Sequence, residues 1–234
     1  MITKGNTIIK LNKNIKIKHK RRKDKCEKQM KKILIVSNMQ NDLIEGEFST
    51  KHSKTILPNV VNKIKNFQNG LLYLTMTSND DDYLETAMGK TIPEKYCIHM
   101  SKGWLIHDDI FNAARESGCE PIFFEIGKCD TDMSDMINQI KSYCDDYDNN
   151  VEIEICGIAT EIGVICLALA LRTFCPYVKI TIDSDCCAGL TKKTHKSALS
   201  IMNVCGINVV GEENYNKLQW ENRAEIQSED QSLD

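Results

Sequence analysis

The stretch of this chain that could do chemistry most directly is the turn Gly157-Ile158-Ala159-Thr160-Glu161-Ile162-Gly163-Val164. It joins an apolar run over residues 151–156, which predicts a buried strand, to an apolar run over residues 162–174, which predicts a helix. In an α/β fold the first amides of such a helix point at the carboxyl edge of the sheet, where they can bind an oxyanion. The turn therefore predicts a ligand pocket, although Gly163 has no side chain and cannot be a nucleophile.

Five separated blocks, in the same order, resemble the isochorismatase-like family of nicotinamidase-type cysteine hydrolases. The first block is IVSNMQNDL, similar to the family's I-V-x-D-M-Q-N-D-F, and the fourth is the turn above, similar to G-[LVI]-x-T-[DE]-[IY]-C-V. The likeness extends over about residues 31–210, and its blocks are residues 35–43, 80–93, 96–104, 157–164 and 183–199.

The resemblance implies a catalytic aspartate, lysine and cysteine, and this chain departs from all three. The aspartate that acts as general base corresponds to Asn38, whose amide cannot accept a proton; hydrogen bonding at a strand end suits it better. The lysine corresponds to Ile126 by gapless matching, or to Lys128, which follows two residues later. The cysteine corresponds to Gly163. Isochorismatases also carry glycine there, but their chemistry still relies on the aspartate.

Many relatives also bind a divalent metal, often zinc, through an aspartate and histidines. The corresponding residues here are Thr77, Asn79 and Tyr96, and none of them is a good zinc ligand. We therefore expect no cofactor. His99 and His107 are close in sequence and leave a relocated metal site as the alternative.

The residues that the resemblance places around the pocket suit a small planar ligand. Several thiols could replace the missing nucleophile. Cys156 and Cys166 lie in apolar segments and are predicted to be core thiols, and Cys186 and Cys187 are predicted to serve packing. Cys97 lies in a loop that flanks the pocket. The predicted pocket comprises Asn38, Tyr96, Lys128, Thr160, Ile162 and Gly163.

Alternating strand and helix patterns predict a doubly wound α/β fold, a Rossmann-like three-layer domain with helices on both faces of the sheet. The strands are apolar throughout, which is typical of a mostly parallel sheet. Six strands are expected, at residues 33–36, 71–75, 121–125, 151–156, 178–182 and 207–210. Helices are expected at residues 54–67, 108–117, 132–143, 161–174 and 192–204.

Charge divides the chain into a domain with two appendages. Residues 1–32 carry 13 Lys and Arg against Asp24 and Glu27, whereas the whole chain has a net charge of −3. We expect residues 1–30 to be a basic, disordered extension with a weak hairpin pattern, residues 31–211 to be the hydrolase-like domain, and residues 212–234 to be an acidic tail. Met30 is an alternative start. The basic cluster at residues 18–25 is either a solvated tail or a site for nucleic acid or an acidic surface.

Composition excludes a membrane protein, because no apolar run approaches about 18 residues. Eleven cysteines without a C-x-x-C spacing favour free thiols in an intracellular, cytoplasmic compartment. Three functions follow. The first is a degenerate family member, a pseudoenzyme that binds or scaffolds, as a homo-oligomer if it follows the family. The second is an active hydrolase with a relocated catalytic group, and the third is a module tethered to nucleic acid by the basic extension.

Overall fold

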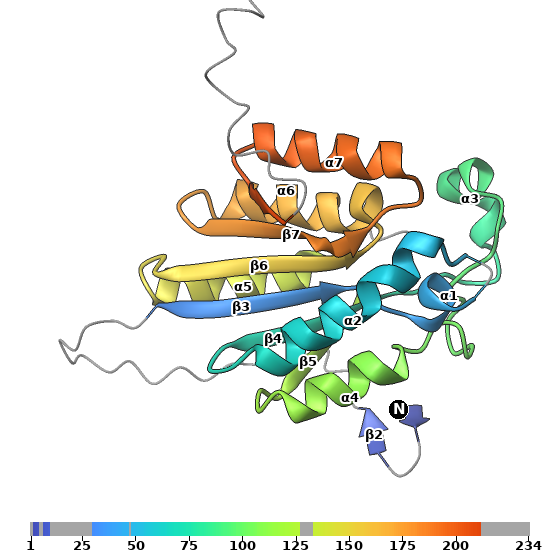
Figure 1. Ribbon diagram of the computed structural model, residues 1–234, viewed down its shortest axis with the longest axis horizontal. Helices are drawn as coiled ribbons and strands as arrows, with labels where there is room; N and C mark the ends of the chain where they lie inside the picture. Colours follow the sequence, from blue (N-terminus) through green and yellow to red (C-terminus); the bar gives the residue numbers. More distant parts are fainter. Residues whose placement is uncertain (1, 5–6, 10–29, 47, 127–132, 212–234) are drawn as a thin grey trace, which may run out of the picture.

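The central element is a six-stranded sheet in which every neighbouring pair of strands is parallel (Figure 1). The computed structural model describes residues 2–4, 7–9, 30–46, 48–126 and 133–211. The strand order is β5-β4-β3-β6-β7-β8. The strands are β3 (Lys31–Ser37), β4 (Leu71–Thr77), β5 (Pro121–Ile126), β6 (Val151–Ile158), β7 (Lys179–Ala188) and β8 (Asn208–Val210). The predicted six-stranded α/β fold is confirmed, with a sheet that is parallel throughout.

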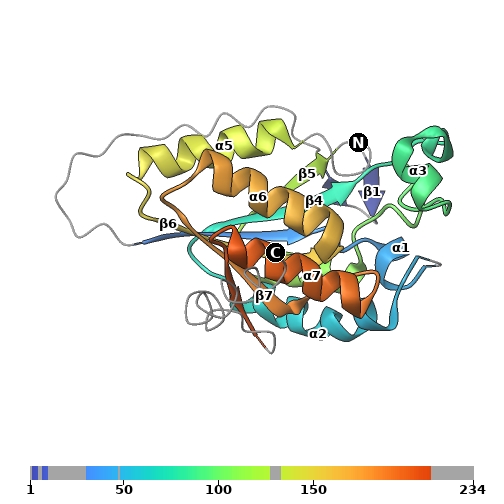
Figure 2. The same cartoon turned by 90° about the horizontal axis from the view of Figure 1, so that it is seen from above.

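Helices cover both faces of this sheet, as the doubly wound prediction requires. Helices α5 and α6 lie on one face and α2 on the other (Figure 2), α4 packs beside α2, and α7 packs beside α6 and β8. Their bounds are α2 (Lys51–Asn66), α4 (Asp108–Glu116), α5 (Ser134–Asp146), α6 (Ile165–Phe174) and α7 (Lys192–Val204). Across the part of the chain that the structure describes, every helix is too short or too polar to cross a membrane.

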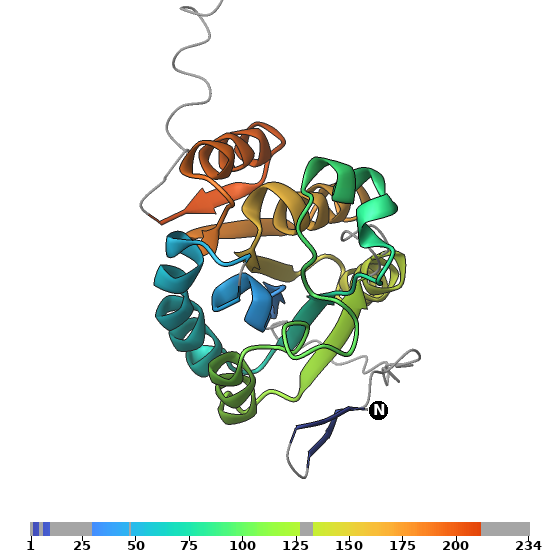
Figure 3. The ribbon, with the colours of Figure 1, turned by 90° about the vertical axis from the view of Figure 1, so that its right-hand side faces the viewer.

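Short elements stand in front of the edge where the strands end (Figure 3). They are α1 (Asn41–Ile44), a 3₁₀ turn (Tyr83–Glu85) and α3 (Ala87–Thr91). A separate antiparallel hairpin is formed by β1 (Ile2–Lys4) and β2 (Thr7–Ile9). It lies in the basic extension, whose sequence has a weak hairpin pattern. The basic cluster at residues 18–25 and the acidic tail at residues 212–234 lie outside the described residues.

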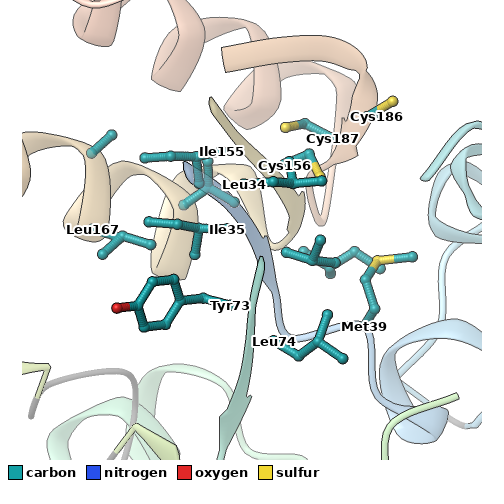
Figure 4. Close-up of a cluster of buried hydrophobic side chains, with 14 of the residues drawn as sticks. Leu34, Ile35, Met39, Tyr73, Leu74, Ile155, Cys156, Leu167, Cys186 and Cys187 are labelled. Carbon is teal, nitrogen blue, oxygen red and sulfur yellow. The ribbon is translucent and has the colours of Figure 1, made fainter. Parts of the chain in front are cut away.

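Side chains alternate between the two faces along each strand, which explains why the strands are apolar throughout. Ile35 pairs in register with both Tyr73 and Ile155, so these three residues share one face of the sheet. Leu34 and Cys156 point to the opposite face (Figure 4). All five are buried, because helices cover both faces.

Several boundaries differ from the sequence prediction, and three of them have a clear local reason. Helix α2 begins at Lys51 rather than residue 54, because Thr50 and Ser53 form a capping box that the apolar periodicity does not show. Strand β7 continues six residues beyond the predicted end, since Cys187 and Ala188 pair with the end of β6. The helix predicted from residue 161 starts with a separate turn and becomes α-helical only at Ile165.

An ion cluster ties α2 to the sheet. The ammonium of Lys63 contacts the carboxylate of Glu154 on β6 and lies 2.7 Å from a carboxylate oxygen of Asp183 on β7. Burial on its own lowers the pKa of Lys63, but the hydrogen bonds from Asp183 and Glu154 outweigh it and raise the pKa. Lys63 therefore stays charged and holds two carboxylates that face the same helix.

Replacing Lys63 with methionine should destabilise the fold, because the two carboxylates lose their shared partner. We expect the free energy of unfolding to fall by roughly 1–3 kcal/mol, below the range for fully buried pairs since these groups are partly exposed. Urea unfolding measures the change. The control is Lys65→Met, whose pair with Glu116 is 49% and 60% exposed and should be worth less than about 1 kcal/mol. Equal effects of the two variants would contradict the prediction.

Candidate functional site

Asn38 follows β3 directly and is held as a hydrogen-bonding residue. Its side-chain oxygen accepts a 2.9 Å hydrogen bond from the hydroxyl of Thr75, and its backbone N–H donates to the Thr75 carbonyl. The backbone of Asn38 is left-handed, with φ of 51°, a conformation that asparagine adopts more readily than most residues. The side chain is buried. Asn38 therefore has the hydrogen-bonding role at a strand end that its sequence position favoured over proton transfer.

Gly157 lets the neighbouring strand end come close to this position. It pairs with Ser37 across β3 and β6 and has φ of 121°. A Cβ atom on Gly157 would lie 2.0 Å from the Ser37 carbonyl oxygen. Only glycine fits there, so the turn after β6 begins directly beside Asn38.

The turn itself, Thr160–Val164, is a single π-type turn ahead of α6. The N–H groups of Ile162 and Val164 both donate to the carbonyl of Ala159, and the peptide bond between Ile158 and Ala159 is cis. Such turns occur frequently at functional sites. The predicted pocket residues Thr160 and Gly163 are buried here, and Ile162 is half-buried.

Helix α7 anchors the turn through two side chains. The hydroxyl of Thr160 lies 2.8 Å from Nδ1 of the buried His195. One carboxylate oxygen of Glu161 accepts hydrogen bonds from the Leu190 N–H, at 2.8 Å, and from the Thr194 hydroxyl, at 2.5 Å. The turn is therefore fixed in place even though Gly163 presents no reacting group.

The lysine position is only partly described. Ile126 is the last residue of β5, pairs with Thr77 and is buried, so it offers an apolar side chain where the resemblance implies a cation. Lys128, the alternative, lies outside the described residues. The structure thus places Asn38, Ile126 and the 160–164 turn at one edge of the sheet and gives no position for Lys128.

The three positions that correspond to metal ligands do lie at this edge, but they do not fit a zinc ion. Thr77 ends β4, and the side-chain amide of Asn79 donates to the carbonyl of Tyr96 at 2.9 Å. The hydroxyl of Thr77 is buried without a hydrogen-bond partner among the described residues. Together the three offer a hydroxyl, an amide and a phenol in place of carboxylate and imidazole.

A relocated site finds no support in the described residues either, where no group of three or more His, Cys, Asp or Glu side chains could hold a metal. His99 lies 3.7 Å from a carboxylate oxygen of Glu125. His107 instead lies 3.2 Å from Glu45. The two histidines serve different partners.

The loop at residues 96–104 is held in place by residues for which the sequence suggested no role. The side chain of Gln40 donates to the carbonyls of Thr77 and Trp104 and accepts from the Thr77 N–H. The carboxylate of Asp42 accepts the Cys97 N–H at 2.7 Å, and a Cβ on Gly103 would lie 1.9 Å from it. Both residues belong to the first block of the resemblance, which was the only available signal. They hold the 96–104 loop against β4.

Tyr96 lies between two other rings, and one of these, Phe48, borders an open cavity. Its ring stacks on Phe48 with centroids 4.3 Å apart and meets Tyr83 edge-on at 5.3 Å. Beside Phe48 is a cavity of about 340 Å³, lined also by Ile92, Pro93 and Leu190 among others. A volume of this order is at the lower end of small-molecule sites, and Phe48 was not predicted.

The thiols considered as replacement nucleophiles divide into two groups. Burial raises the pKa of Cys156 and of Cys187, and raises the pKa of Cys186 to about 12. These cysteines are core thiols, as predicted. The prediction was wrong for Cys166, which is exposed on α6: every residue around it is apolar, so periodicity could not tell the buried face from the open one. Cys205 is likewise exposed, after α7.

Residues 32–214 match the isochorismatase domain, and the chain belongs to the isochorismatase family. No curated protein matches the sequence.

Solved structures agree on the fold. The nicotinamidase PncA from Bacillus subtilis is 18% identical with a TM-score of 0.64 and covers 78% of this chain and 100% of its own. The pyrazinamidase of Pyrococcus horikoshii, solved in complex with zinc, is 20% identical with a TM-score of 0.58 and covers 77% and 98%. PnC1 from L. infantum, solved in complex with nicotinate, is 13% identical with a TM-score of 0.62 and covers 77% and 92%.

The anchor between α7 and the turn gives a first prediction for this site. Thr160→Val keeps the shape but removes the hydroxyl that pairs with His195, and we expect the free energy of unfolding to fall by about 1–3 kcal/mol. Thr173→Val is the matched control: that exposed hydroxyl donates to a carbonyl within α6. Urea unfolding compares the two. If Thr160→Val costs no more than the control, the anchor does not hold the turn.

A second prediction concerns the thiols. In the native protein, iodoacetamide should alkylate Cys166 and Cys205, while Cys156 and Cys187 should react on the order of 100-fold more slowly, since they need an opening of the fold. Peptide mass spectrometry follows each cysteine separately. Rapid alkylation of Cys156 would contradict the assignment to the core and revive it as a nucleophile.

Proposed function

We propose that this isochorismatase-family protein has lost hydrolysis and acts as a pseudoenzyme that holds a small planar ligand or a partner. The observation that carries the proposal is Asn38, buried at the end of β3 with its amide oxygen accepting the Thr75 hydroxyl. A general base must take a proton from the attacking group. An amide oxygen already used as a hydrogen-bond acceptor does not do this near neutral pH.

Two other positions support the same reading. Gly163 offers no side chain for attack on a carbonyl, and Ile126 offers no charge to stabilise an anionic intermediate. The neighbouring core thiols are poor substitutes, because the pKa of Cys156 is raised by burial and the thiolate is the reactive form. Loss of base, nucleophile and cation together is hard to combine with turnover.

What the site retains is suited to binding. The turn is anchored to α7, the 96–104 loop is fastened by the carboxylate of Asp42, and Phe48, whose ring stacks on Tyr96, lines a cavity. Aromatic walls favour flat apolar ligands. One similar structure contains nicotinate and others are nicotinamidases or pyrazinamidases, so pyridine and pyrazine carboxamides are the first compounds to test. Self-association remains a prediction from the family resemblance.

The alternative is an active hydrolase with a relocated group, for which Lys128 and Cys97 are the candidates. Cys97 is buried, and its N–H is held by Asp42. Lys128 has no described position. The alternative makes the opposite prediction for turnover.

The test is ammonia release from nicotinamide and pyrazinamide by the purified full-length chain, with and without added zinc. We expect no release above the protein-free rate, because base, nucleophile and cation are all replaced. A folded sample is verified by circular dichroism, and nicotinate titration by calorimetry then reports whether the pocket still binds a planar acid. Release that is abolished by Lys128→Ala or Cys97→Ala would overturn the proposal and identify the relocated group.

A further inference from the structure

A second cavity, of about 300 Å³, lies where α2, β7 and α7 meet at the carboxyl edge of the sheet. It exists because β8 is short: its last residue, Val210, pairs with Asp183, and β7 continues beyond that point. The residues of β7 that follow, beginning with Ser184, therefore face the space between the two helices. None of the predicted pocket residues that the structure describes lines this cavity.

The lining is polar and carries more positive than negative charge. Lys192 and Lys196 on α7 face Asp185 on β7, and one further side of the cavity is formed by His52 and His195. Within the described residues, no carboxylate oxygen lies within 4 Å of the Lys192 ammonium. A polar cavity of this kind selects a charged occupant, because apolar ligands leave its polar groups unpaired.

His52 adds a hydrogen-bonding group without adding charge. Its ring meets His195 edge-on, with centroids 5.0 Å apart, and its Nδ1 is buried without a partner among the described residues. Burial lowers the pKa of His52, Lys192 lowers the pKa further, and Glu161 opposes both. A bound anion would offset the positive charge of Lys192 and so favour protonation of His52.

We propose that this cavity binds a small phosphate-class anion, either free inorganic phosphate or the terminal phosphate of a monoester. Cationic side chains reach the cavity from α7 and imidazole groups from both α2 and α7, an arrangement that suits a tetrahedral anion with oxygens in several directions better than a planar carboxylate. The first turn of α7 adds the partial positive charge of a helix start on the same side. Among the described lining residues Asp185 is the one carboxylate that opposes the anion, and two ammonium groups outweigh it.

The test is calorimetric titration of the full-length protein with inorganic phosphate, at an ionic strength held constant with sodium chloride. Wild type should bind saturably, and the double variant K192Q/K196Q should bind at least about tenfold more weakly. The matched control is Lys193→Gln, an exposed lysine on the same helix that does not line the cavity, which should bind within about twofold of wild type. Absence of saturable binding, or equal effects of the two variants, would overturn the proposal.

A second readout needs no variant. Sulfate has the same shape as phosphate and keeps its charge across the titration of histidine, so it serves as the probe for NMR titration of His52. Bound sulfate should raise the pKa of His52, because an anion stabilises the protonated ring. It acts against the effect of Lys192, Lys196 and His195, and in the same direction as the carboxylates of Asp185 and Glu161. An unchanged pKa of His52 at saturating sulfate would contradict an anion in this cavity.

The source of the phosphate is resolved by a third titration, with glycerol 3-phosphate. Tighter binding of the ester than of inorganic phosphate identifies a monoester site that continues out of the cavity, and equal or weaker binding identifies a site for free phosphate. Acetate at the same ionic strength should not compete with either. Competition by acetate as strong as that by phosphate would refute the preference for a tetrahedral anion. These outcomes do not depend on whether the protein hydrolyses amides.

Discussion

The close approach of β6 to the end of β3 is the constraint on which the rest of the site depends. Gly157 fits only because it has no Cβ, since that atom would lie 2.0 Å from the Ser37 carbonyl oxygen. This contact sets where the chain leaves the sheet and hence where the 160–164 turn begins. The hydrogen bonds from His195 and Thr194 on α7 then fix the turn against the edge. The sheet edge, the turn and α7 form one rigid unit that is independent of any reacting group.

That independence supports the proposal that the fold is kept while hydrolysis is lost. The groups that shape the edge are Gly157, Gln40, Asp42 and His195, and each forms buried contacts that stabilise the fold directly. Among the positions that correspond to reacting groups, Gly163 has no side chain and adds nothing to these contacts. Loss of a buried hydrogen-bond partner, by contrast, costs about 1–3 kcal/mol.

The sequence was sufficient for the fold and for the location of the edge, because strand burial and helix periodicity are local signals. The six strands and the parallel sheet follow from apolar runs such as that of β3. It was insufficient wherever a side chain acts across the fold: the anchor of Thr160 by His195 and the fastening of Cys97 by Asp42 join elements that no pattern in the chain connects. The prediction that Cys166 is buried failed for a different reason: the run around it at residues 165–171 is wholly apolar and has no periodicity that distinguishes one face from the other.

If Ile126, rather than Lys128, stands where relatives have their lysine, the residues at positions 38 and 126 are linked by electrostatics. A carboxylate at position 38 would be buried, and a buried charge without a partner destabilises a fold by several kcal/mol as an order of magnitude. In the family the lysine offsets that charge, whereas here gapless matching puts isoleucine in its place. With isoleucine there, an amide at position 38 avoids the unpaired charge and still accepts the Thr75 hydroxyl. Neutral Asn38 and apolar Ile126 are thus consistent with each other. Restoring aspartate alone at position 38 would bury a charge that has no cation to offset it.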